Sequence, residues 1–256
     1  MSLGNSYRDV KISLCCTIIA VVLSGDLCSL RAQTGDASTP PKSSAADQEK
    51  RTEEKHTKPI LDALNLNDAA KEAKVREIVG AQIKALNDWH AQNDAQIKSL
   101  WTEFSQARSK QNETNADAAL AKIDAVYATF KPQHQKFESE LSSVLTPERV
   151  ETVKDALTID KVKITFNAYG EIFHGLTDEQ KAFILKNLKA AREEAIDAGP
   201  MTEKSNFFKK YKIKIEAYLT TQGYDVKESY HVFVAKQKAE EAAKKAAARS
   251  AADDKK

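Results

Sequence analysis

The sequence predicts an all-α protein in which a long antiparallel helix hairpin packs on a smaller helical unit. A flexible N-terminal linker and a charged helical C-terminal tail flank this core. Two long stretches carry apolar residues at steps of three and four, which is the spacing of amphipathic helices. Glycine and proline are scarce, 8 and 6 in 256 residues, so turn-rich β structure is disfavoured. Charged residues make up 30% and aromatic residues 7%, which favours thin, solvated helices.

The segment 1–32 is predicted to be a secretory signal peptide. Arg8 and Lys11 precede the apolar stretch Ile12 to Leu23, and Ala32 offers a cleavage position. The apolar stretch holds about a dozen residues, fewer than the roughly 20 that a membrane-spanning helix needs. We therefore expect a periplasmic or secreted protein with no stable membrane span after cleavage. A signal that is retained as an N-terminal anchor is the alternative.

The charge and the cysteine content weigh against several classes of function. The net charge is only +2, which argues against bulk electrostatic attraction to nucleic acid. All three cysteines, Cys15, Cys16 and Cys28, lie within the predicted signal peptide. The mature chain would therefore have no disulfide, no thiol nucleophile and no thiolate metal site.

The remainder of the chain divides into a linker, a helical domain and a tail. Residues 33–58 are rich in Ser, Thr, Pro, Ala and charge, which predicts a disordered linker. The helical domain is expected over 59–224. The segment 225–256 is a charged helical tail, in which Glu240 and Glu241 each precede a lysine by four residues. Its end carries almost nothing apolar larger than alanine, so we expect a solvated or fraying helix.

The long hairpin is expected between a polar cap and a proline-containing return helix. Asn67 is predicted to cap a helix from Ala69 to about Gln111, about 60 Å long at 1.5 Å per residue. After a polar turn, the return helix runs from about Ala116 to Val144. Pro132 should kink this helix or split it in two. Its apolar stripe has the spacing of a coiled-coil seam and comprises Leu120, Ile123, Tyr127, Phe130, His134, Phe137, Leu141 and Val144.

A short helix and a connector follow the hairpin. Thr146 is predicted to be an N-cap, with Pro147 at the first helical position, where its missing amide costs nothing. Residues Thr158 to Phe166 alternate weakly and are β-branched. They are predicted to form an extended connector, because no second strand is available to pair with them. Asn167 to His174 is predicted to be a short helix or turn.

The most clearly bounded element is a second helix hairpin, from Gly175 to Tyr224. Thr177 and Gln180 have the spacing of a capping box, in which each side chain bonds the other residue's backbone amide. The pair Gly199–Pro200 is expected to end the first helix, with the glycine in the left-handed conformation. An aromatic and aliphatic stripe carries the second helix to about Gly223.

Two resemblances follow from these motifs. Leu145-Thr146-Pro147-Glu148-Arg149 and Leu176-Thr177-Asp178-Glu179-Gln180 resemble the LTxxQ motif of the Spy/CpxP periplasmic helical proteins, with Arg149 in place of the glutamine. A more extensive resemblance, over roughly Ile60 to Lys227, is to a family of secreted bacterial proteins catalogued as domain of unknown function 3826. It rests on the same two motifs and on Leu86-Asn87 with His90, Ala191-Arg192-Glu193-Glu194-Ala195, Asp197-Ala198-Gly199, Tyr211-Lys212 and Gly223-Tyr224-Asp225. The resemblance implies export and a helical fold, and it offers no known catalytic residues to transfer to this chain.

Histidines and acidic residues four apart on the helices raise the question of a metal. His90 with Asp94, and His134 with Glu138, could each share an ion, but such pairs are common by chance and no metal site is predicted. Two Glu-x-x-His motifs with two further glutamates build the di-iron site of helical bundles. Three such motifs end at His56, His174 and His231. None is placed mid-helix by its flanking sequence, so we interpret them as coincidence.

Acidic, basic and aromatic residues are densest in the second hairpin, and most candidate binding residues come from there. The acids beside Arg192 could form an acid pair, although a salt-bridged surface explains them equally well. The lysines from Lys204 to Lys214 alternate with aromatic residues, which in an exported protein suggests anionic glycans, lipid headgroups or cell wall. The alternative is that the aromatic rings pack inward and the lysines are solvated. The candidates are His90, Tyr169, Arg192, Glu193, Asp197, Lys204, Tyr211 and Lys212.

The sequence carries no nucleophile elbow, no phosphate-binding glycine loop and no H-E-x-x-H motif, so no catalytic residue and no cofactor is predicted. We expect a non-enzymatic binding protein, and the first hypothesis is an envelope chaperone or stress-related interaction protein. One alternative is an accessory protein or enzyme that binds or acts on cell-surface or plant-type polysaccharide. Another is a metal-binding helical bundle. The expected partner is an unidentified protein or glycan, and pairing of the heptad seam in a homodimer remains open.

Overall fold

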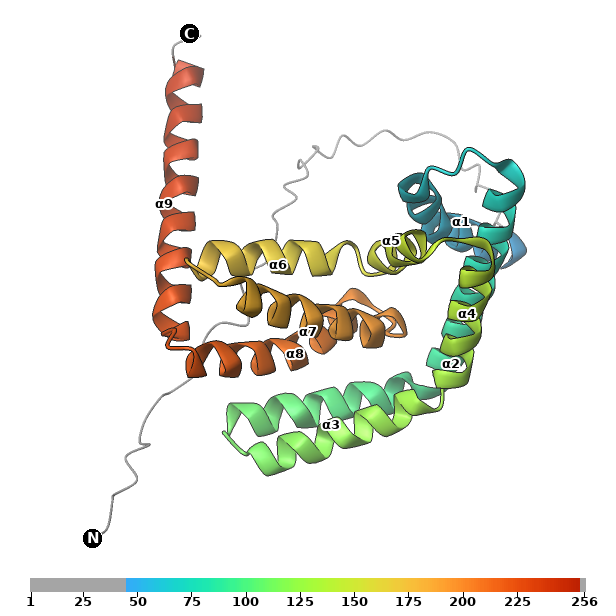
Figure 1. The fold of residues 1–256 in the computed structure, drawn as a ribbon, viewed down its shortest axis with the longest axis horizontal. Coiled ribbons are helices and arrows are strands. Elements are labelled where there is room, and N and C mark those ends of the chain that lie inside the picture. Colours follow the sequence, from blue (N-terminus) through green and yellow to red (C-terminus); the bar gives the residue numbers. More distant parts are fainter. Residues whose placement is uncertain (1–44, 254–256) are drawn as a thin grey trace, which may run out of the picture.

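The computed structural model describes residues 45–253, which form nine α-helices and no strand (Figure 1). The predicted all-α class is therefore confirmed. The predicted signal peptide and the linker residues 33–44 lie outside the described residues. In chain order the helices are α1 (Ala45–Leu64), α2 (Ala69–Ser109), α3 (Glu113–Ala128), α4 (Lys131–Val144), α5 (Pro147–Leu157), α6 (Lys161–Ile172), α7 (Asp178–Ile196), α8 (Met201–Thr221) and α9 (Val226–Asp253).

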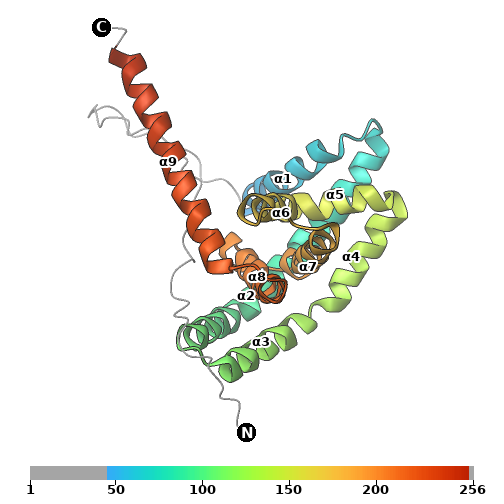
Figure 2. The ribbon, with the colours of Figure 1, turned by 60° about the vertical axis from the view of Figure 1, so that its left-hand side comes forward.

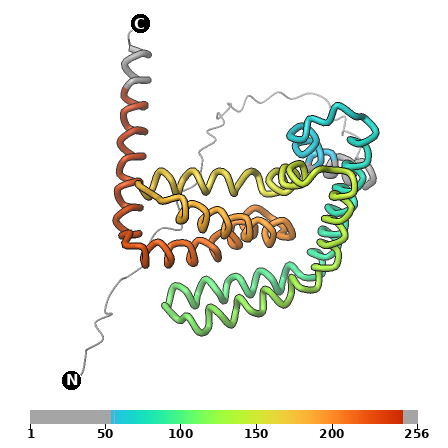
Figure 3. The backbone as a smooth tube through the Cα atoms, in the orientation of Figure 1, coloured from blue at the N-terminus to red at the C-terminus, as the bar shows by residue number. Residues whose placement is uncertain are grey.

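The first hairpin is formed by α2 on one side and by α3 and α4 on the other. The return helix is split between Ala128 and Lys131, as expected from Pro132, which lies in the first turn of α4. The expected cap of α2 is wrong by one residue, because the Asp68 carboxylate accepts the Lys71 amide at 3.0 Å. Figure 3 shows the hairpin turning partway along, so that α2 runs beside α4 in one arm and beside α3 in the other.

Each arm of the hairpin contributes to its own hydrophobic core. The arm with α4 packs on α1 and α5, and we name this the α1/α5 core. The arm with α3 packs with α6, α7 and α8, and we name this the α7/α8 core. The buried stripe of α2 passes from the first core at Val79 to the second at Ile97. Polar side chains of the intervening turns, among them Gln82 and His90, are buried where the two cores meet.

The second hairpin has the predicted start and end, with one difference in its turn. Thr177 and Gln180 form the capping box, with bonds of 3.2 and 2.9 Å. The turn after α7 does contain Gly199, but positive φ angles occur only at Gly175 and Gly223 among the glycines described. The reason for glycine at 199 is close approach, because a Cβ there would lie 3.2 Å from a Glu203 oxygen and 3.3 Å from the His90 ring.

Two local predictions were wrong. Residues Thr158 to Phe166 do not form an extended connector, because α6 begins at Lys161. The α7/α8 core decides this: α6 buries Val162, Tyr169 and Ile172 at helical spacing, which overrides the β propensity of its branched residues. Residues 45–58 are not a disordered linker but lie in α1. The apolar residues that anchor α1 are at its C-terminal end, where Ile60, Leu61 and Leu64 are buried.

The predicted charged helical tail is α9, which leaves the body at the end of α8 and projects away from it (Figure 2). Val226, Tyr230 and Phe233 pack against the α7/α8 core, and residues 235–246 are exposed. Only the first two turns of α9 are therefore anchored. Within the part of the chain that the structure describes, no helix is both long and apolar enough to span a membrane.

Candidate functional site

Five of the eight candidate residues gather where the two cores meet. His90 comes from the middle of α2, Arg192 and Glu193 from the last turns of α7, Asp197 from its C-cap, and Lys204 from the first turn of α8. His134 of α4 and Lys154 of α5 join them. We call this set of seven residues the polar layer, because it separates the α1/α5 core from the α7/α8 core.

Arg192 is the most buried charge of the layer, at 1% exposure. Its guanidinium donates to Asp155 and to Glu151, both at 2.7 Å, and to Glu193 at 2.9 Å. Burial alone would lower the pKa of Arg192, but the three carboxylates outweigh it and hold the pKa above its ordinary value. The arginine therefore stays charged and ties α7 to α5.

Lys154 is the second buried cation, and it lies between two glutamates. Its ammonium group donates to Glu193 at 2.8 Å and makes a short contact with Glu138. Burial lowers the pKa of Lys154, and the two carboxylates raise it by more, so the net shift is upward. Glu193, one of the acids beside Arg192 that the sequence offered for an acid pair, is thus held as the partner of two internal cations.

His134 and Asp197 form the part of the layer that faces α4. The ring Nδ1 of His134 lies 2.9 Å from an Asp197 oxygen, and this hydrogen bond raises the pKa of His134. Burial raises the pKa of the Asp197 carboxyl. Lys204 lies beyond it and donates to the carbonyls of Ala195 and Ile196 at 3.0 and 3.3 Å. Its burial lowers the pKa of Lys204 to about 8.

His90 is held at both ring nitrogens. Nε2 lies 2.8 Å from the backbone oxygen of Asp197, and Nδ1 lies 2.6 Å from Oδ1 of Asp94. Next to the ring is Glu203, which accepts from the Tyr127 hydroxyl at 2.6 Å and from the Gly199 amide at 2.8 Å. Burial and the Glu203 carboxylate raise the pKa of Tyr127, so the phenol remains a donor.

The sequence did not identify His134 and Lys154 as members of the polar layer, nor Glu203, which lies next to His90. His134 was seen only as part of the heptad stripe and of a possible pair with Glu138. Glu203 did carry a local signal: it is the third residue of α8, where an acid can reach back to a preceding amide, as it does to Gly199. Nothing local distinguishes Lys154 from the other lysines.

The remaining three candidates lie elsewhere. The hydroxyl of Tyr211 donates to Glu194 at 2.7 Å on the α7–α8 surface. Tyr169 is buried and stacks on Phe173. The Lys212 ammonium lies 4.4 Å from the ring centroid of Tyr230 at the base of α9. The eight candidate residues are therefore distributed over the polar layer, the α7–α8 surface and the junction of α6, α8 and α9.

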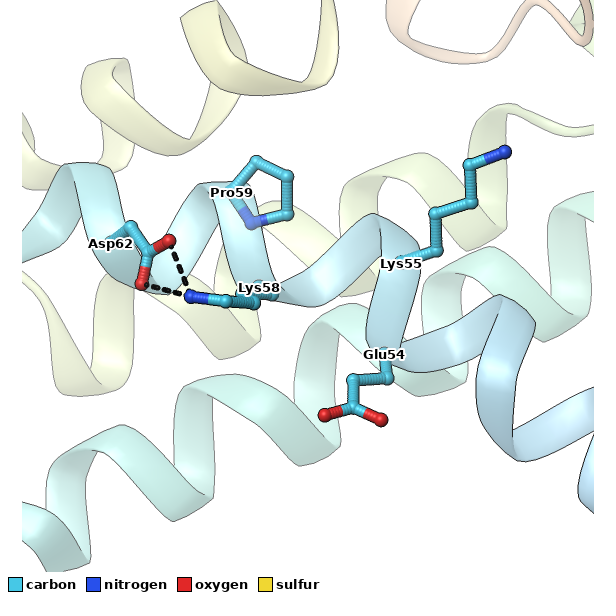
Figure 4. A pocket seen from close by; sticks show the side chains of 5 residues that line it. All are labelled: Glu54, Lys55, Lys58, Pro59 and Asp62. Carbon is cyan, nitrogen blue, oxygen red and sulfur yellow. Dashed lines mark hydrogen bonds and ion pairs between the residues drawn. The ribbon is translucent and has the colours of Figure 1, made fainter.

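Two surface hollows lie away from the polar layer. One is formed by a single helix, α1, where Lys58 and Asp62 pair at 2.8 Å (Figure 4). Another lies along the exposed side of α2, from Ala95 to Gln106. Both are shallow and open to solvent. They are the grooves of single helices, and neither is lined by any of the eight candidate residues.

A family model described as "Protein of unknown function (DUF3826)" matches residues 50–239. The match contains all eight candidate residues and the whole polar layer, and it confirms the more extensive of the two resemblances found in the sequence. The likeness to Spy/CpxP-type proteins stays a prediction. No curated protein matches the chain.

Proposed function

The chain belongs to the DUF3826 family, and from this premise we propose that it is an exported, non-enzymatic binding protein whose partner is another protein. Export is supported by the signal peptide predicted over 1–32. A scaffold role for the polar layer is supported by its paired charges, since the buried arginine and lysine each neutralise two or more carboxylates. The function would then reside on the surface that this scaffold supports.

The observation that carries the proposal is an exposed isoleucine in the turn between α5 and α6. Ile159 has a φ of 53° and is 59% exposed. A β-branched residue in this left-handed region costs about 1–3 kcal/mol, and the exposed position returns no burial for that cost. Ile164 in α6 is a further large apolar residue at 49% exposure. Contact with a partner would give these side chains the burial that the chain itself does not.

The turn that presents Ile159 is held firmly from both sides. The Thr158 hydroxyl, which is buried, bonds the Lys154 carbonyl at 3.1 Å. The amide of Asp160 donates to the Asp155 carbonyl at 2.9 Å. Lys161 donates to Ser205 in α8 at 3.1 Å. Because these bonds fix the backbone of the turn, binding there costs little backbone entropy, which favours a docking role.

The chemistry of this turn suits an apolar segment of another exported protein. Exposed apolar residues bind partners that also expose apolar surface. The sequence favours an envelope chaperone, so the expected partner is an unfolded client protein.

The test is the variant Ile159→Asn. Asparagine adopts the left-handed conformation more readily, so the variant should be more stable by about 1 kcal/mol, or about 2–4 °C in Tm for a chain of this size. It should also suppress the aggregation of a chemically unfolded client less well than the wild type. The measurements are thermal unfolding and light scattering of the client.

Val232→Asn is the matched control, because Val232 is also exposed, at 53%, but lies on α9. This variant should suppress aggregation of the client as well as the wild type does. A wild type that does not suppress aggregation, or an Ile159→Asn variant that suppresses it fully, would contradict the proposal. Polysaccharide binding that survives in Ile159→Asn would favour the glycan alternative instead.

A further inference from the structure

The two hydrogen-bonding partners of His90 determine where the protons of its ring can be. The Asp197 carbonyl can only accept, so Nε2 of His90 carries a hydrogen and donates it over 2.8 Å. In the neutral ring Nδ1 then has a lone pair, and it faces Oδ1 of Asp94 at 2.6 Å. Two acceptors at this distance repel each other. A proton or another cation must therefore lie between His90 and Asp94.

A third ligand comes from α8. A ring nitrogen of His90 and carboxylate oxygens of Asp94 and Glu203 all lie within 4.8 Å of one another. The Glu203 carboxylate is oriented by hydrogen bonds from Tyr127 and from the Gly199 amide, at 2.6 and 2.8 Å. Among the ion pairs of residues 45–253 that the structure describes, none joins Asp94 or Glu203 to a lysine or an arginine. Two carboxylates here share one imidazole and no directly paired lysine or arginine, while the buried Lys204 ammonium acts on Glu203 from a longer distance.

The backbone beside the cluster keeps space at the ligand atoms. A Cβ on Gly199 would lie 3.2 Å from Oε2 of Glu203 and 3.3 Å from Nδ1 of His90. Gly199 does not have a positive φ, so its conformation does not require glycine. The missing side chain serves instead to leave free the space that the two ligand atoms border.

A second cluster, also of one histidine and two acidic residues, shows what fills such a space elsewhere in the fold. His134, Glu138 and Glu193 also bring ligand atoms within 4.8 Å of one another. There the Lys154 ammonium pairs with both glutamates. The lysine pairs directly with both carboxylates, whereas no lysine or arginine ion pair is formed by Asp94 or Glu203 in the described part of the chain, and Lys204 acts on Glu203 only at longer range.

We propose that His90, Asp94 and Glu203 bind a divalent transition-metal ion, with Zn²⁺ or Mn²⁺ as the class that fits. One imidazole nitrogen with two carboxylates suits such ions, whereas Mg²⁺ and Ca²⁺ prefer oxygen ligands alone. The bond from Nε2–H to a carbonyl is the arrangement that orients metal-binding histidines. Asp94, whose side chain is 61% exposed, opens the site to solvent and can shift outward. Two ligand atoms of a tetrahedral ion lie about 3.4 Å apart at the usual bond lengths. Asp94 would therefore move away from its 2.6 Å contact with His90 when the ion binds.

The experiment is calorimetric titration of the full chain, freed of metal with a chelator, with ZnCl₂ and separately with MnCl₂. One ion should bind per chain, and Tm should rise with the concentration of that ion. Asp94→Asn, at an exposed position that the fold tolerates, should weaken binding by at least the ~10–100-fold that loss of an outer-shell partner costs. Gly199→Ala, which fills the space, should weaken it as well.

Asp88→Asn is the matched control, because Asp88 is an exposed acid on the same helix whose carboxylate pairs with Lys84 at 3.5 Å. Its metal affinity should equal that of the wild type. Titration of CaCl₂ should give no comparable site. The proposal fails if neither Zn²⁺ nor Mn²⁺ binds stoichiometrically, or if Asp94→Asn binds as tightly as Asp88→Asn. In that case a proton alone joins His90 to Asp94.

Discussion

The Nε2–H of His90 donates to the backbone carbonyl of Asp197 over 2.8 Å, although 107 residues separate them in the chain. The bond fastens the middle of α2 to the end of α7. It lies in the polar layer between the two hydrophobic cores, where apolar packing alone would not determine how one core sits on the other. Directional hydrogen bonds in the polar layer therefore specify how the two cores are positioned against each other.

Arg192→Met should lower the free energy of unfolding by about 3 kcal/mol, which is the lower end of the cost of breaking a buried ion pair. The lower end applies because the Glu151, Asp155 and Glu193 side chains are each more than a third exposed. Urea unfolding measures the effect. Arg76→Met is the control, since Arg76 pairs with Glu72 on the surface of α2 and should cost no more than about 1 kcal/mol. Equal losses in the two variants would show that burial does not strengthen the pairs of Arg192.

Local signals were enough to predict most helix boundaries. The capping box of Thr177 and Gln180, and the break near Pro132, depend on neighbouring residues only, and both were predicted correctly. The helix α6 was missed because the α7/α8 core, built from residues far along the chain, decides its conformation. Ile159 was missed for a related reason, since a left-handed isoleucine contradicts every local preference.

The membership of the polar layer could be predicted only in part. Arg192, Glu193 and Asp197 are neighbours on one helix, so a local search found them together. Glu203, beside the layer, approaches His90 only because α8 folds back along α7, and no single-sequence pattern encodes that contact. The pairs His90 with Asp94 and His134 with Glu138 suggested a metal. Without a third ligand in view, chance spacing explained them better than a metal site.

His134 should make the stability depend on pH. Its pKa is raised in the folded state by the hydrogen bond to Asp197 and by the nearby Glu138 and Glu193, whereas the unfolded value is about 6.5. The imidazolium therefore stabilises the fold fully below about pH 6.5, and this contribution is lost as the pH rises through the folded pKa. The difference in unfolding free energy between wild type and His134→Gln should shrink from pH 5.5 to pH 8.5.

The control for this pH dependence is His231→Gln, because His231 is exposed on α9. This variant should follow the wild-type pH profile of unfolding free energy. A His134→Gln profile that runs parallel to the wild type over the whole range would mean that His134 keeps the same protonation state in the folded and unfolded chains.

The base of α9 should contribute to stability and its far end should not. Tyr230 packs edge-on against Phe173 at 5.8 Å between ring centroids and lies under the Lys212 ammonium. Because the ring is only partly buried, Tyr230→Ala should lower the free energy of unfolding by about 2 kcal/mol, less than the 3–5 kcal/mol typical of a core aromatic.

Deletion of residues 238–256 should leave the urea midpoint unchanged, since residues 238–246 are exposed and contribute helix propensity alone. A deletion that destabilises the chain as much as Tyr230→Ala would show that the projecting part of α9 contacts the body or a second chain in solution, and a concentration-dependent midpoint would identify the second chain.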